Sequence, residues 1–179
     1  MTMNVNVILE KGTEKDIDEL ENLYNSLNDY LATHTNHPGW RKGIYPVRET
    51  AATGIKEDTL YVVRIDGVIA GSIILRQYME PTYYEVDWDV EAELKNIFVI
   101  CTFAVHPNYL RMGLGKRMME LVIEYAKTKA IRAIRLDVYE HNIPAITLYE
   151  SYGFDYIDTV DLGHGEYGLD WFKLYQKIL

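Results

Sequence analysis

The residues best suited to binding an anion lie in one stretch, 105–116, which reads Val-His-Pro-Asn-Tyr-Leu-Arg-Met-Gly-Leu-Gly-Lys. An apolar run at 97–105 predicts a buried strand before it, and apolar residues at helical spacing over 114–127 predict a helix after it. Gly113 and Gly115 allow close approach of a ligand to the backbone, and angles that a β-carbon disfavours. Since N–H groups at the start of a helix attract negative charge, we expect a pyrophosphate-binding turn here.

Charge supports this expectation. Between residues 108 and 119 the only charged side chains are Arg111, Lys116 and Arg117, although acidic residues outnumber basic ones 27 to 18 in the whole chain. Basic residues that flank a helix are often simply solvated, and the adjacent glycines favour phosphate binding over that alternative.

Two common nucleotide motifs are excluded. A dinucleotide fingerprint needs a third glycine where Met118 stands, and a phosphate-binding loop of nucleoside triphosphatases needs Gly-Lys-Ser/Thr. The stretch instead resembles the acetyl-CoA loop of the GNAT superfamily of N-acetyltransferases, Arg/Gln-x-x-Gly-x-Gly/Ala after Val-His-Pro. Leu110 stands where the family has Arg or Gln, and Arg111 follows it. The resemblance implies acetyl-CoA as co-substrate, held largely by the backbone of Arg111, Met112, Gly113, Leu114, Gly115 and Lys116.

A second segment, 142–154, resembles the family pattern Asn-x-x-Ala-x-x-Leu-Tyr-Glu-x-x-Gly-Phe. Asn142 is a good N-cap and Gly153 a natural helix stop, so a short helix is expected between them. On it Asn142, Ala145 and Tyr149 share one face, along which a pantetheine arm fits.

The resemblance implies a reaction: acetyl transfer from acetyl-CoA to a primary amine of a small molecule or peptide, by direct attack. Tyr149 matches the tyrosine that protonates the CoA sulfur, although a helix aromatic can also be only a packing residue. The backbone of Phe103, Ala104 and Val105 matches the strand that pairs with pantetheine. Asn142 matches a CoA-contacting asparagine, a role compatible with capping. The alternative is a non-catalytic CoA-binding or regulatory domain of the same fold.

No single general base stands out. The candidates are acids near the expected acetyl site, with a chain of water molecules as the alternative: Glu85, Asp87, Glu91 and Glu93. Cys101 is expected to be a buried, inert strand thiol rather than an acyl carrier, because no histidine is beside it in sequence.

An acidic aromatic stretch at 78–93 has three interpretations. It can attract and stack on a cationic amine, anchor a surface loop, or form a contact between two copies, which leaves a homodimer open. His34, His37 and Trp40 likewise either reach the acceptor or only pack. With five histidines and no close Cys/His spacing, no metal site is expected.

Length and composition indicate one domain over residues 1–179, of ordinary globular character, with 48% apolar and 25% charged residues. The pattern predicts a first strand at 5–9, a helix capped by Thr13, a helix at 47–56 and a hairpin around Asp66-Gly67. Further strands are expected at 133–139, 154–160 and 171–178. We therefore predict an α/β fold of the GNAT type: a mixed, mostly antiparallel sheet of about six to seven strands with helices on both faces.

The net charge of −9 argues against nucleic acid as a partner. No segment approaches the ~20 apolar residues that span a bilayer, and the N-terminus lacks a signal-peptide pattern. We expect a cytoplasmic protein without membrane association, and the single cysteine excludes an internal disulfide.

Overall fold

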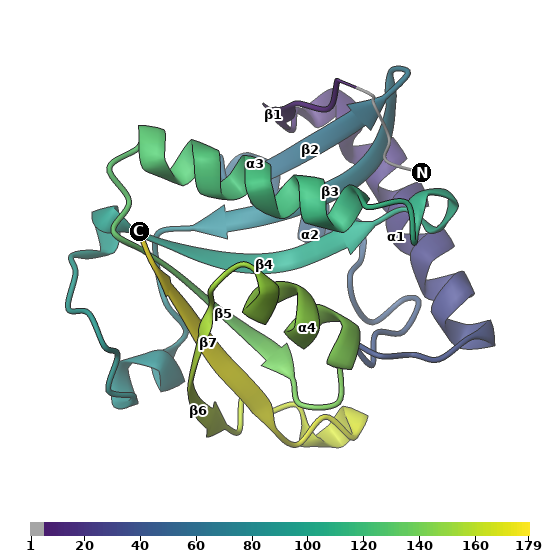
Figure 1. Ribbon diagram of the computed structural model, residues 1–179. Helices are drawn as coiled ribbons and strands as arrows, with labels where there is room; N and C mark the ends of the chain where they lie inside the picture. The colour runs from purple at the N-terminus through teal and green to yellow at the C-terminus, as the bar shows by residue number, and fades with distance from the viewer. Residues whose placement is uncertain (1–5) are drawn as a thin grey trace. The chain divides into compact units, whose positions relative to one another are not determined.

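The structure, a computed structural model, describes residues 6–179 and consists of two compact units. Within this range it forms a seven-stranded sheet with the order β1-β2-β3-β4-β5-β7-β6 (Figure 1). One pair, β4–β5, is parallel, whereas β1–β2, β2–β3, β5–β7 and β6–β7 are antiparallel. The predicted mixed, mostly antiparallel sheet is confirmed.

The first unit comprises the chain up to Asn36 together with Trp40–Leu75 and Thr102–Ile123. It begins with β1 (Leu9–Lys11), which overlaps the strand predicted at 5–9 only at Leu9; Val5 lies outside the described residues. Thr13 then forms the expected capping box with Asp16, whose carboxylate accepts the Thr13 N–H at 2.9 Å. The helices α1 (Ile17–Thr33) and α2 (Arg48–Lys56) follow as predicted.

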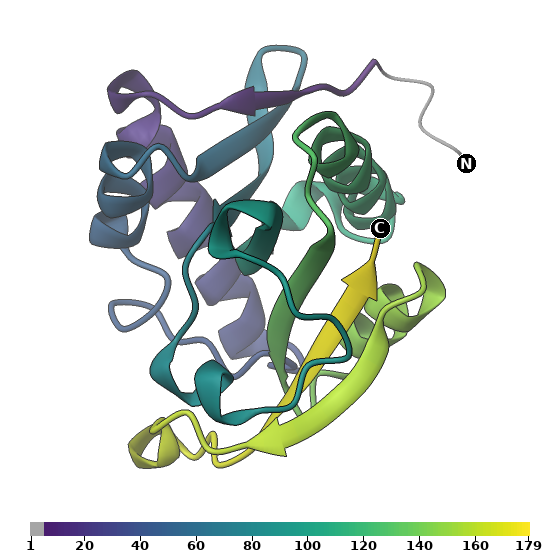
Figure 2. The ribbon, with the colours of Figure 1, turned by 90° about the vertical axis from the view of Figure 1, so that its left-hand side faces the viewer.

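The hairpin of this unit joins β2 (Leu60–Ile65) to β3 (Val68–Arg76) through Asp66 and Gly67. Both turn residues have positive φ, 51° and 79°, as a two-residue mirror-image turn requires. Helices α1 and α2 lie on one face of these strands and α3 (Leu114–Thr128) lies on the other (Figures 1 and 2). The close approach of α3 depends on Gly71, because a β-carbon there would lie 2.6 Å from the Met118 sulfur.

The second unit comprises His37–Gly39, Arg76–Cys101 and Glu124–Leu179. It contains the first half of β4 (Ile97–Val105), β5 (Ala133–Tyr139), α4 (Ile143–Ser151), β6 (Asp155–Val160) and β7 (Phe172–Ile178). The β4–β5 ladder runs from the pair Ile97–Ala133 to the pair Ile100–Leu136. These bounds match the predicted strands and helix to within one residue.

Segment 76–96 and α4 cover opposite faces of β5 and β7 (Figure 2). The segment contains the short helices η2 (Pro81–Glu85) and η3 (Leu94–Asn96), and Arg135 anchors it to the sheet. The Arg135 guanidinium, 3% exposed, donates to the Val90 carbonyl at 2.7 Å and to Gln176 Oε1 at 2.9 Å. It also lies 4.3 Å from the ring centroid of Trp88. Within residues 6–179 there is no helix long and apolar enough to cross a membrane.

Candidate functional site

In the first unit, the end of β4 leads directly into the predicted anion-binding turn. Ala104 is 1% exposed and Phe103 and Val105 are half-buried, while the His106 N–H donates to the Ala70 carbonyl at 2.8 Å and ties this end to β3. The His106 ring accepts the Asn108 N–H at 3.1 Å and so caps the short helix Pro107–Tyr109. The strand and loop are therefore fixed up to the start of the turn.

The turn itself has the open backbone that the sequence predicts. Arg111 and Gly113 have φ values of 61° and 82°, and a β-carbon on Gly113 would have no protein atom within 4 Å. A β-carbon at this position would therefore lie in open space. The first α3 hydrogen bond joins the Arg117 N–H to the Gly113 carbonyl at 3.1 Å, so the helix leaves the N–H groups of residues 113–116 to other partners.

Gly115 differs from what the sequence predicts. Gly115 does not take up a glycine-only conformation: it lies in the first turn of α3, and only Gly113 of the two has positive φ. A first-turn helical position needs no special backbone angles, so Gly115 contributes small size alone. Leu114 is buried beneath the turn, whereas Arg111, Met112 and Lys116 are exposed. Arg117 is paired with Glu120 at 3.1 Å.

In the second unit, α4 begins and ends as predicted. The Asn142 side-chain oxygen accepts the Ala145 N–H at 3.4 Å, which makes Asn142 the N-cap, and Gly153 follows the helix with φ 80°. Asn142 and Ala145 are half-buried and Tyr149 is 6% exposed.

Tyr149 is a neutral phenol in this environment. Its ring lies 5.8 Å from the Phe154 ring, which belongs to the same motif. Burial raises the pKa of Tyr149 well above the ordinary phenol value, and Asp137 and Cys101 raise it further. A phenol that stays protonated can donate a proton to a developing anion.

Sequence reasoning missed Asp137, which has the most perturbed carboxylate environment near Tyr149. It lies on β5 and accepts a 2.6 Å hydrogen bond from the hydroxyl of Tyr83, a residue 0% exposed. Burial raises the pKa of Asp137, the Tyr83 hydrogen bond lowers it, and Glu80 raises it again. A carboxylate whose pKa is raised is a stronger base than an ordinary one. The available signal was an acid between two apolar strand residues, Leu136 and Val138, both of which are buried.

The four acids considered from the sequence have a different character. Glu85, Asp87, Glu91 and Glu93 are all exposed, and Glu93 is paired with Lys95 at 2.7 Å. None of them shares the half-buried position and the hydrogen bond to a buried tyrosine that distinguish Asp137.

Cys101 is half-buried and packs against the apolar cluster of Tyr83, Ile97, Val99 and Leu174. Burial raises the pKa of its thiol from 9.0 to about 12, so the thiolate is scarce at neutral pH. The expectation of an inert strand thiol is consistent with this environment.

The acidic aromatic stretch divides into two kinds of residue. Tyr83 and Trp88 are anchors: the Trp88 indole N–H donates to the Tyr83 carbonyl at 2.8 Å. Tyr78 and Tyr84 are 42% and 61% exposed. His34 is exposed and stacks on Tyr30 at 3.8 Å between ring centroids.

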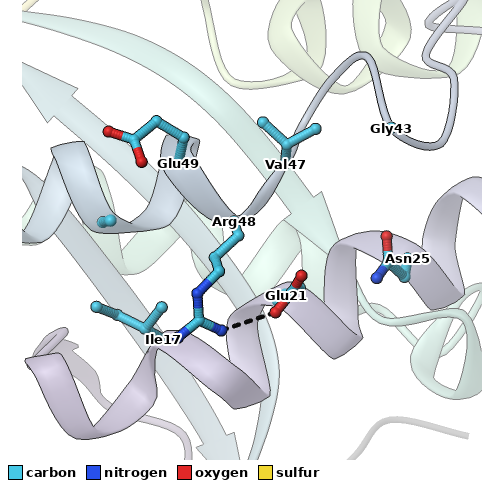
Figure 3. A pocket seen from close by; sticks show the side chains of 8 residues that line it. Ile17, Glu21, Asn25, Gly43, Val47, Arg48 and Glu49 are labelled. Atoms are coloured by element: carbon cyan, nitrogen blue, oxygen red, sulfur yellow. Dashed lines mark hydrogen bonds and ion pairs between the residues drawn. The ribbon is translucent and has the colours of Figure 1, made fainter.

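A separate groove of about 440 Å³ lies between α1 and α2 in the first unit (Figure 3). It contains none of the predicted site residues, and is lined by Ile17, Glu21, Asn25, Gly43, Val47, Arg48, Glu49 and Ala52. Arg48 donates to Glu21 at 2.7 Å and to Asp18 at 2.6 Å, which joins the two helices. Within residues 6–179 no group of three or more His, Cys, Asp or Glu side chains is placed to hold a metal ion.

Comparison with known proteins decides the family. The sequence profile of the acetyltransferase (GNAT) family matches residues 20–154, a span that includes the turn, Asp137 and Tyr149. The chain belongs to the GNAT family. Members use acetyl-CoA as co-substrate.

Curated relatives match this GNAT chain over shorter segments. The [ribosomal protein bS18]-alanine N-acetyltransferase of Escherichia coli K12 is 40% identical over 65 residues, 36% of this chain and 40% of that protein. The spermine/spermidine N(1)-acetyltransferase of Bacillus subtilis 168 is 35% identical over 60 residues, 33% and 40% of the two chains. The UPF0157 protein YqkA of the same strain is 35% identical over 78 residues, 44% and 22% of the two chains. The chain therefore spans less than half the length of each of these relatives.

Solved GNAT structures match nearly the whole chain. An acetyltransferase of the family from Streptococcus agalactiae 2603 superimposes with a TM-score of 0.82 and 20% identity, over 98% of this chain and 99% of that chain. A second, from Listeria monocytogenes 4b F2365, superimposes with a TM-score of 0.78 and 18% identity, over 100% of this chain and 98% of that chain. At these identities the likeness establishes the fold alone.

Proposed function

We propose that this protein is an N-acetyltransferase that transfers an acetyl group from acetyl-CoA to a primary amine of a small molecule or peptide. The observation that carries the proposal is that the second unit contains both an acid and a base: the neutral phenol of Tyr149, whose pKa is raised by burial and by the charge of Asp137, and the Asp137 carboxylate, whose pKa is raised by burial. Amine acetylation needs both, because the nucleophile must lose a proton and the departing thiolate must gain one.

In the first unit, the proposed binding groups belong to β4 and the turn. The backbone of residues 103–105 pairs with the pantetheine amides, and one N–H polarises the thioester oxygen. The N–H groups of residues 113–116 hold the pyrophosphate, with Arg111 and Lys116 adding positive charge. The open space at Gly113 supports this assignment, because a phosphate needs close backbone approach.

In the second unit, Asp137 accepts the proton of the acceptor ammonium or amine, and Tyr149 donates its proton to the sulfur. The amine attacks the thioester carbonyl directly, so no acyl-enzyme forms on Cys101. Asn142 caps α4 and contacts CoA. The similarity to a ribosomal-protein alanine N-acetyltransferase and to a spermine/spermidine N(1)-acetyltransferase favours two acceptor classes, an alanine amine of a protein and a polyamine. A single domain over residues 1–179, a cytoplasmic location and a homodimer stay predictions.

The test is a thiol-release assay. Acetyl-CoA is incubated with the protein and a panel of polyamines, aminoglycosides, amino acids and peptides with free N-termini, and free CoA is measured with a thiol reagent. Acceptor-dependent release is expected for at least one class, and it should be lost in Asp137→Asn. Calorimetric binding of acetyl-CoA without release for any acceptor would favour the non-catalytic CoA-binding domain, the alternative consistent with Leu110 in place of the family's Arg or Gln.

A further inference from the structure

Thr102 has an unusual backbone conformation in the middle of a strand. Its φ is 48°, in the left-handed region, although it lies within β4. The other residues apart from glycine with positive φ in the described range all lie in turns: Asp58, Asp66, Arg111 and Ala130. For a β-branched residue this conformation is a genuine outlier, and it persists only where the surroundings impose it.

The surroundings of Thr102 form a chain of contacts that reaches back to α1, all within the first unit. Thr102 is 7% exposed, and its hydroxyl is hydrogen-bonded to the hydroxyl of Tyr45. The Tyr45 carbonyl accepts from Asn28 Nδ2 at 3.2 Å, and Asn28, on α1, is 1% exposed. The Tyr45 N–H donates to the Arg41 carbonyl at 3.0 Å, and the Trp40 ring meets the Tyr45 ring edge-on at 5.5 Å.

We propose that Tyr45 is a positioning residue: its hydroxyl holds Thr102 in the left-handed conformation and thereby sets the direction of the backbone N–H and C=O groups of residues 103–105. The side chain of a residue turns with its backbone, so Thr102 cannot relax to an extended conformation and keep its bond to Tyr45. In a regular strand, successive N–H groups alternate in direction. One left-handed residue shifts this alternation of N–H directions for every residue that follows it in the strand.

This inference rests on the proposed function, which assigns the acetyl-CoA arm to residues 103–105. Without the clamp, the left-handed conformation of a residue with a β-carbon is disfavoured by roughly five- to thirtyfold in population. The apparent affinity for a ligand that needs this conformation falls by the same factor.

The test uses Tyr45→Phe, Thr102→Val and Thr102→Gly, alone and combined. Tyr45→Phe and Thr102→Val each remove one partner of the hydroxyl pair, and each should lower kcat/KM for acetyl-CoA by about five- to thirtyfold. The double change should cost no more than either single one. Glycine adopts positive φ without a clamp, so adding Thr102→Gly to Tyr45→Phe should restore kcat/KM to within about threefold of the parent.

The matched control is Tyr156→Phe. It removes another tyrosine–threonine hydroxyl contact, Tyr156 to Thr159 at 2.8 Å on β6, and should leave the kinetics unchanged. A purely structural role for Tyr45 predicts a lower melting temperature and no rescue by glycine. A folded Tyr45→Phe protein with parental kinetics, or a loss that Thr102→Gly does not repair, would overturn the proposal.

Hydrogen exchange at the amides of residues 103–105 separates this inference from the proposed function. In the protein without substrate, Tyr45→Phe should speed this exchange and Tyr156→Phe should not. If the parent neither binds acetyl-CoA nor releases CoA, the proposed function fails while exchange still reports on the clamp. Unchanged exchange at these amides in Tyr45→Phe would refute the clamp by itself.

Discussion

At the scale of single residues, removing only the Tyr149 hydroxyl tests its role in proton transfer separately from the packing of its ring. Tyr149→Phe keeps the ring and its contact with Phe154, so folding and acetyl-CoA binding should survive. The departing thiolate loses its proton donor, and general acid catalysis typically contributes ~10² to 10⁴ in rate, so kcat should fall by that range. Steady-state kinetics with an identified acceptor checks this. A kcat within about twofold of the parent would leave Tyr149 as a packing residue.

The Tyr83 hydroxyl controls the protonation of Asp137. It donates to the Asp137 carboxylate at 2.6 Å and so stabilises the charged form against burial and Glu80. In Tyr83→Phe the pKa of Asp137 should rise further. The base works only when deprotonated, so the acidic limb of kcat/KM against pH should move to higher pH.

The neighbouring Tyr84→Phe is the control for this shift, because Tyr84 is 61% exposed and should leave the profile in place. Arg76 and His164 act on Asp137 in the opposite direction to Glu80. The pH profiles of kcat/KM for the parent and the two variants are therefore compared at one ionic strength. A limb that moves to lower pH in Tyr83→Phe would contradict the assignment of Asp137 as base.

At the scale of elements, the turn before α3 depends on backbone that is open at Gly113. Gly113→Val should place side-chain atoms in front of the turn and raise the acetyl-CoA Kd tenfold or more, about 1.4 kcal/mol. Gly163→Val is a matched control, because the φ of Gly163 is 83°, close to the 82° of Gly113, and a β-carbon on Gly163 would also lie in open space. Both variants carry similar strain. Calorimetry that finds equal affinities for the two folded proteins would place the pyrophosphate elsewhere.

The packing of α3 on β3 gives a prediction about stability alone. A β-carbon at Gly71 would meet the Met118 sulfur at 2.6 Å and the Ala104 carbonyl at 3.0 Å. Gly71→Ala should lower the free energy of unfolding by about 1 to 3 kcal/mol, as overpacking usually does. Urea denaturation measures this. Because Met118→Ala removes the closest atom, the double variant should be less destabilised than the two single effects added together.

The elements were accessible from the sequence because their signals are local. Apolar runs define 97–105 and 133–139, Asp66-Gly67 defines the hairpin, and Asn142 and Gly153 delimit α4. The kink at Thr102 was not predictable, because a β-branched residue in an apolar run carries no turn signal and its partner Tyr45 is 57 positions away. Asp137 was not identified as a base because its partner Tyr83 is 54 positions away in the sequence.

At the scale of the whole molecule, the proposed reaction is a direct attack of the acceptor amine on the acetyl-CoA thioester. Direct attack requires acetyl-CoA and the amine to be bound together before any product leaves. Burial raises the pKa of Cys101 to about 12, which disfavours the thiolate that a route through an acyl-enzyme would need.

Initial-velocity kinetics tests this claim most directly. CoA release is measured while acetyl-CoA and the acceptor amine are both varied. Direct attack predicts CoA release that depends on both substrates, with double-reciprocal lines that intersect. Parallel lines together with an acetyl group trapped on the protein, or CoA release that is independent of the amine, would contradict it.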